Sequence, residues 1–172
     1  MIMRSNFIVF TILIFIQIFV LNKMLFFDYV LISPYLLVLI LNPYYKDSIL
    51  SLFLGFVLGV LLDVFNDSLG LYSLISIIIV YFKNFWVLKV IGEEKANEIS
   101  LLSIFNLGNF NFFNYAFPLI ILYYLLIIIF EFNVLFSLNN FLILTLSSFS
   151  TYFFMTLIQY LFLKSDQKNE WR

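Results

Sequence analysis

Residues 51–65 read SLFLGFVLGVLLDVF, an apolar stretch in which Asp63 is the only ionisable side chain. Residues four apart lie on one face of an α-helix, so Ser51, Gly55, Gly59 and Asp63 form one stripe along this segment. The two glycines leave a groove beside an acid, and such a groove lets another helix approach closely inside a bilayer. The stretch therefore predicts a membrane-spanning helix with one face reserved for helix–helix contact.

The composition of the whole chain supports a membrane protein. Of 172 residues, 64% are hydrophobic and 11% are charged, against about 45–50% and about 25% in soluble domains. Cysteine and histidine are both absent, which excludes disulfides, Cys/His zinc sites and histidine-dependent catalytic triads. No glycine-rich phosphate loop is present either. We therefore expect no enzymatic activity, no cofactor and no metal, and the net charge of −1 gives no reason to expect a nucleic-acid partner.

The number of membrane spans follows from the lengths of the apolar stretches, because a helix needs about 20 mostly apolar residues to cross a bilayer. A further apolar segment at 25–41 contains Asp28 and Pro34, so it either crosses as a kinked helix or enters the membrane and returns. The sequence thus predicts an all-α integral membrane protein, a compact bundle of about six transmembrane helices, with five as the alternative. The clear spans are 7–21, 48–65, 70–88, 116–132 and 140–163.

The basic residues predict the orientation, because Lys and Arg concentrate in cytoplasmic loops. With six spans and a cytoplasmic N-terminus, only Lys23 lies outside. In a five-span chain with its N-terminus outside, Arg4 lies outside and Lys23 lies inside. Eight basic residues are then still cytoplasmic against one outside, and the orientation after Lys46 is the same. The C-terminus is expected in the cytoplasm in both cases. The basic residues on the cytoplasmic side of the six-span arrangement are Arg4, Lys46, Lys83, Lys89, Lys95, Lys164, Lys168 and Arg172.

Two segments are expected in the cytoplasm, a loop near 89–114 and a short tail at 164–172. The loop begins with the polar sequence GEEKANE at 92–98 and continues with a polar residue at every third position from Ser100 to Asn109. That spacing suggests a short helix on the membrane surface, and the alternative is that the next spanning helix begins early. Neither segment is large enough for a second domain, so residues 1–172 are expected to form a single multi-pass domain.

The polar residues near the third span allow two interpretations. The stripe of Ser51, Gly55, Gly59 and Asp63 is a candidate contact surface for the transmembrane helix of a partner, or else an internal seam between helices of this chain. Asp63, together with Asn66 and Asp67, is a candidate functional cluster; the alternative is that the acid caps the next helix, with Gly70 easing the turn. Gln17 in the first span needs a hydrogen-bond partner on a neighbouring helix.

The stretch GFVLGVLLDVF at 55–65, followed by Leu69, Gly70 and Leu71, resembles the signature region of the MreD family of rod shape-determining membrane proteins. Two positions depart from the family pattern: Tyr72 stands where the family often has histidine, and Lys83 with Asn84 stands where it often has Arg-Pro. The resemblance extends at low density to Gln17, Val20, Leu21, Asn22, Pro34, Tyr35, Pro43, Phe85, Val87, Leu88, Lys89 and Glu131.

The resemblance implies a non-enzymatic scaffold of the bacterial rod-shape or cell-elongation complex, in the cytoplasmic (inner) membrane. Its expected partners are the lipid bilayer and an MreC-like bitopic membrane protein. Through the latter it would reach the MreB filament, a RodA-type glycosyltransferase and its transpeptidase, and so help to organise peptidoglycan synthesis.

Two other functions compete with the scaffold. The helix number and size also resemble the solute-binding subunit of an energy-coupling-type vitamin transporter, in which Gln17, Asp63, Asn66 and Asp67 would line a pocket for a small solute. The remaining possibility is a purely structural bundle whose polar groups hold its own helices together.

Overall fold

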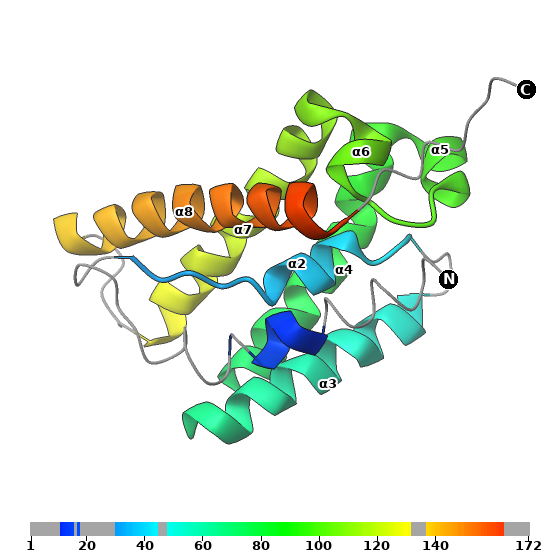
Figure 1. Cartoon of the computed structure of the whole chain (residues 1–172). Helices are drawn as coiled ribbons and strands as arrows, with labels where there is room; N and C mark the ends of the chain where they lie inside the picture. The colour runs from blue at the N-terminus through cyan, green and yellow to red at the C-terminus, as the bar shows by residue number, and fades with distance from the viewer. Residues whose placement is uncertain (1–10, 16, 18–29, 45–47, 132–136, 164–172) are drawn as a thin grey trace, which may run out of the picture.

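The computed structural model describes residues 11–15, 17, 30–44, 48–131 and 137–163, and Figure 1 shows their arrangement. Every regular element of that part is a helix, which confirms the all-α prediction. A short helical stretch covers 11–15 and 17. The other helices are α2 (Leu36–Leu41), α3 (Ser48–Asn66), α4 (Leu71–Ile91), α5 (Glu93–Glu98), α6 (Ile104–Leu107), α7 (Asn109–Glu131) and α8 (Leu138–Phe162).

Within these ranges four helices are long and apolar enough to cross a membrane: α3, α4, α7 and α8. They match the predicted spans at 48–65, 70–88, 116–132 and 140–163. Helix α7 begins at Asn109, as in the alternative that this helix starts early. The predicted span at 7–21 lies mostly outside the described residues, so the structure shows four candidate spans rather than six.

The four long helices pack in the order α3, α4, α7, α8, so α4 and α7 are central and α3 and α8 flank them. The central helices are the most buried, and side chains such as Ile75, Ile79, Leu119 and Ile120 have no exposed surface. The flanking helices carry more of the exposed large apolar side chains than the central helices do. This distribution fits a bundle whose outer surface meets lipid rather than water.

Of the two alternatives for 25–41, a helix that crosses the membrane with only a kink is not seen in the part that the structure describes. Residues 30–33 are not helical, a turn follows at 34–35, and α2 has only 6 residues. The cause is Pro34, which has no N–H to donate and disfavours the helical conformation in the residue before it. The segment nevertheless lies deep in the protein, because Leu36, Leu37 and Ile40 are fully buried.

Side chains of α7 and α8 satisfy the non-helical backbone at the start of this segment, which runs along α8 in Figure 1. The N–H of Leu31 donates to Ser147 Oγ at 2.9 Å, and the Leu31 carbonyl accepts from the Tyr124 hydroxyl at 2.8 Å. The N–H of Ser33 donates to Thr151 Oγ1 at 3.4 Å. These bonds replace those that a continuous helix would have made within itself.

The carbonyl groups at the end of α2 are also bonded from outside the helix. The Tyr115 hydroxyl donates to the Ile40 carbonyl at 2.8 Å, and the Leu102 N–H donates to the Leu41 carbonyl at 3.1 Å. The last carbonyls of any helix lack partners within it. Helix α7 and the segment before α6 thus complete a short helix that would otherwise be unstable in lipid.

A hydrogen bond is also replaced inside α7, where Pro118 lacks the N–H that would bond to the carbonyl of Asn114. The Trp86 indole of α4 donates to that carbonyl at 3.2 Å. The helix therefore tolerates its proline because a neighbouring helix supplies the missing donor.

The connection between α4 and α7 is shorter than the predicted loop at 89–114, because α4 runs to Ile91 and α7 begins at Asn109. It contains α5 and α6, which gather at one end of the bundle (Figure 1). The predicted surface helix amounts to the single turn of α6, and its first residue, Ile104, is buried and donates its N–H to Gln159 Oε1 at 2.9 Å. The predicted tail at 164–172 lies outside the described residues.

We predict that Tyr115→Phe lowers the stability of the folded protein by about 1–3 kcal/mol, because it leaves the buried Ile40 carbonyl without its donor. Tyr160→Phe is the matched control, since the Tyr160 hydroxyl bonds to Asn109 Oδ1 at an exposed site, and it should change stability by less than about 0.5 kcal/mol. Thermal unfolding in detergent measures both. Equal losses for the two variants would contradict this role of Tyr115.

Candidate functional site

The stripe of small residues on α3 faces α4 inside the chain. A Cβ atom added to Gly59 would overlap the backbone of Tyr72 and Ser73, and one added to Gly55 would lie 2.9 Å from Val80 Cγ2. Two helix backbones can approach this closely only where one of them lacks a side chain. The glycines therefore form a tight seam between α3 and α4.

Polar contacts close both ends of this seam. At one end, the Asn84 side-chain amide donates to Ser51 Oγ at 3.0 Å, and Ser51 has no exposed surface. At the other end lies Asp63, which is 7% exposed. All four residues of the stripe thus contact α4 or the turn that leads into it.

Asp63 caps the N-terminus of α4. Its carboxylate accepts from the N–H of Tyr72 at 2.8 Å, the N–H of Ser73 at 2.9 Å and the Ser68 hydroxyl at 2.6 Å. The residue at the N-cap position is Gly70, whose φ of 86° is left-handed and which has no side chain to accept from these donors. An acid from the preceding helix therefore supplies the acceptor that the cap residue cannot.

This geometry corresponds to two of the alternatives drawn from the sequence: the internal seam and the helix cap. Helix α4 covers Ser51, Gly55, Gly59 and Asp63, so the stripe leaves no room for the helix of a partner in this structure. The structure therefore favours an internal seam over a partner-binding stripe. Any surface that binds a partner has to lie on another face of the bundle.

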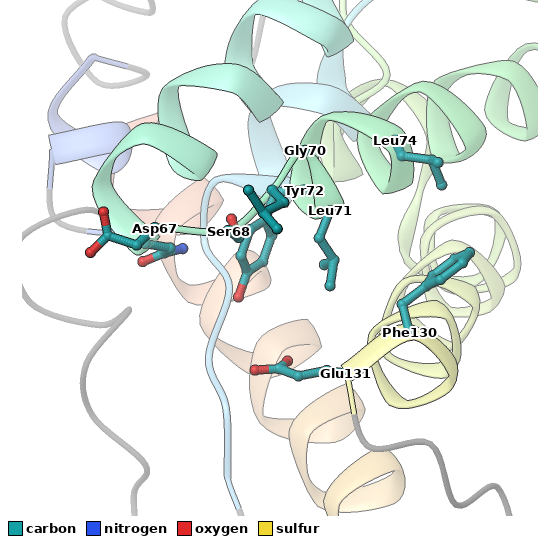
Figure 2. A pocket seen from close by; sticks show the side chains of 10 residues that line it. Asp67, Ser68, Gly70, Leu71, Tyr72, Leu74, Phe130 and Glu131 are labelled. Carbon is teal, nitrogen blue, oxygen red and sulfur yellow. The ribbon is translucent and has the colours of Figure 1, made fainter.

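An open hollow of about 720 Å³ lies beside the α3–α4 turn. Figure 2 shows Tyr72 of α4 and Glu131 at the end of α7 reaching into it, with Asp67 to one side on the turn. Asp67 adopts a left-handed φ of 53°. The lining residues are Asn66, Asp67, Ser68, Leu69, Gly70, Leu71, Tyr72, Leu74, Phe130 and Glu131.

The residues proposed for a solute pocket are thus only partly brought together. Asn66 and Asp67 line the hollow, whereas Asp63 points into the α3–α4 seam. Gln17 is 3% exposed and is not among the lining residues. Among the described residues, no group of three acidic side chains lies close enough together to hold a metal ion.

Lys83 is the residue whose role the sequence interpretation missed. It was counted among the cytoplasmic charges, but it is 0% exposed within α4. Its Nζ donates to the carbonyls of Leu39 and Asn42, at 3.4 and 3.1 Å. The signal was present in the sequence, because Lys83 falls inside the span predicted at 70–88, where an ionisable residue indicates a specific partner.

Comparisons with known proteins found no match to this chain among family models, curated proteins or solved structures.

We predict that Gly59→Ala destabilises the protein more than Gly55→Ala does. The new methyl group at position 59 meets backbone atoms of α4, which cannot move without separating the helices, whereas at position 55 it meets the end of a valine side chain. Overpacking of this kind costs about 1–3 kcal/mol. Thermal unfolding of the two variants in the same detergent checks the order, and a more stable Gly59→Ala variant would rule out the seam.

We also predict that Asp63→Asn lowers stability by about 1–3 kcal/mol. An asparagine has one acceptor oxygen, so its amide nitrogen would face a buried donor that the carboxylate now satisfies. Asp67→Asn should be nearly neutral, because Asp67 is exposed and asparagine readily adopts a left-handed φ. The measurement is again the unfolding midpoint, and similar losses at 63 and 67 would refute the capping role.

Proposed function

We propose that this chain is a non-enzymatic membrane scaffold of the bacterial cell-elongation machinery. In this proposal it binds an MreC-like bitopic protein and, through it, helps to organise the MreB filament and a RodA-type glycosyltransferase with its transpeptidase. The supporting observation is that the residues of the MreD-like pattern converge on one structural unit. Gly55 and Gly59 bring α3 and α4 together, Asp63 caps α4, and Gly70 forms the turn.

The small amount of chain outside the long apolar helices, within the described residues, agrees with this proposal. Between α4 and α7 the chain forms only the short helices α5 and α6, and the rest of the described part, apart from 11–15, 17 and the segment 30–44, consists mainly of the four helices long enough to cross a membrane. A protein built in this way offers other proteins mainly its membrane-embedded surface. Helix packing and hydrogen bonds, rather than the expulsion of water, then provide the affinity.

The outer face of α3 is the best surface for such a contact. Helix α3 packs mainly against α4, and 28% of its span is buried, the lowest value of the four. Ile49, Phe53, Phe56 and Val64 share one helix face by their spacing and are all exposed. In this proposal the α3–α4 seam fixes the orientation of the helix, and this exposed apolar face meets the partner.

The proposed orientation places the end of the bundle with α5 and α6 in the cytoplasm, as the positive-inside rule suggests. Lys83 no longer counts as a loop charge because it is buried in α4. The remaining basic residues still favour the same side, since Lys89 and Lys95 both lie near this end.

A second candidate function is the solute-binding subunit of an energy-coupling-type vitamin transporter, and the hollow beside the α3–α4 turn favours it. In the proposed orientation that hollow opens on the side opposite the cytoplasm. Its lining combines the Tyr72 hydroxyl and the carboxylates of Asp67 and Glu131 with apolar side chains such as Phe130. Binding pockets for small molecules have this mixture of apolar walls and a few polar groups.

We predict that a photo-crosslinking amino acid at position 53 captures a bitopic membrane protein in living rod-shaped cells. Phe153 on α8 is the matched control, because Phe53 and Phe153 are 62% and 63% exposed. The expected result is an MreC-like protein crosslinked from position 53 and only lipid from position 153. Mass spectrometry of the crosslinked species identifies the neighbour.

Two results would contradict the proposed contact on α3. Lipid alone at both positions would remove the proposed contact surface, and capture of the same protein at 153 would move it to α8. The transporter subunit would instead show an unfolding midpoint that rises with a vitamin-like solute, and Glu131→Gln would abolish the rise by removing a carboxylate from the hollow.

A further inference from the structure

The side chain of Lys83 crosses from α4 to the end of α2. Lys83 is 0% exposed, and its ammonium group donates to the carbonyl oxygen of Asn42 at 3.1 Å and to that of Leu39 at 3.4 Å. Both carbonyls belong to the last turn of α2 or the residue after it. The contact therefore joins a central spanning helix to the short helix of the broken segment.

Among the described residues, this buried ammonium group has backbone carbonyls as partners and no counter-ion. Six acidic residues fall in the described part of the chain, and none of them forms an ion pair with Lys83. An ionisable side chain at membrane depth is costly unless charged or polar groups compensate it. Here the compensation comes from carbonyl oxygens. The six are Asp63, Asp67, Glu93, Glu94, Glu98 and Glu131.

Carbonyl groups at the end of an interrupted membrane helix resemble the ligands that hold sodium in secondary transporters, where unwound backbone coordinates a small cation. An ammonium group can use the same carbonyl oxygens, because it is also a compact monovalent cation, but it donates hydrogen bonds to them and needs fewer of them than a metal ion does. In this chain the cation is covalently attached to α4.

We propose that the C-terminal end of α2 is a monovalent-cation site that the chain occupies with its own Lys83 ammonium group. The attached cation holds α2 against α4 without any bound ion, so the broken segment is fixed under all ionic conditions. This inference is independent of the two functions proposed above, because it concerns how the segment is held rather than what the bundle binds.

The experiment compares Lys83→Ala with Lys89→Ala on the same helix. Lys89 is exposed and lies 4.6 Å from the centre of the Phe85 ring. Each variant and the unmodified protein are extracted and unfolded thermally in chloride salts of equal ionic strength. The cations are methylammonium, sodium and N-methylglucamine, the last of which is too bulky for a site built around a side-chain ammonium group.

In N-methylglucamine, Lys83→Ala is expected to unfold about 5 °C or more below the unmodified protein. Methylammonium should restore about half of this loss or more, and sodium should restore less because two carbonyls are few ligands for a metal ion. The unmodified protein and Lys89→Ala should show the same midpoint in all three salts. A Lys83→Ala variant that responds to none of the cations would overturn the proposal.

Two further measurements cover the case in which Lys83→Ala does not fold. Lys83→Met keeps the side-chain stem without the charge, and a Met variant as stable as the unmodified protein would also overturn the proposal. In the protein without substitutions, an amine-acetylating reagent should acetylate Lys89 and Lys95, while Lys83 should not be acetylated until the protein unfolds. Equal modification of Lys83 and Lys89 in the folded protein would show that the ammonium group is not enclosed.

Discussion

Backbone N–H and C=O groups have no water to bond inside a lipid bilayer, and the structure depends on meeting that constraint where the chain is not helical. The segment 30–44 is the place where the demand is greatest. Its polar backbone groups bond to Ser147 and Thr151 of α8, to Tyr115 and Tyr124 of α7, and to Lys83 of α4. Three of the four long helices therefore contribute side chains to one interrupted segment, which explains why hydroxyl groups lie in the core of so apolar a protein.

The same constraint explains the contacts between long helices. Trp86 donates to the carbonyl that Pro118 leaves without a partner, and Asp63 accepts from the N–H groups at the start of α4. In each case the helix that lacks a bond receives it from a neighbour. Together with the glycine seam, these bonds hold α3, α4 and α7 in a fixed arrangement, from which the proposed contact face of α3 and the hollow beside Glu131 both follow.

Much of the candidate site could be predicted from sequence, but its partners could not. The spacing of Ser51, Gly55, Gly59 and Asp63 was sufficient to show that this face of α3 contacts another helix, because helical periodicity is a local property. The choice between α4 and a foreign helix was not local, since both fit a groove of the same width. Lys83 illustrates the same limit: its place inside the predicted span at 70–88 indicated a buried partner, but only the position of α2 shows that the partner is the backbone of Leu39 and Asn42.

The sequence by itself predicted an all-α membrane protein, and it located the four long apolar helices that the structure shows among the described residues, because hydrophobic length and helical spacing act over neighbouring residues. It also placed Pro34 where a helix would break. The tertiary structure alone decided that α4 fills the glycine groove, that Asp63 caps α4 and that Lys83 bonds to the end of α2. Each of these contacts joins residues far apart in sequence or on different helices, and they form because a buried polar group takes whichever partner the packing brings within reach.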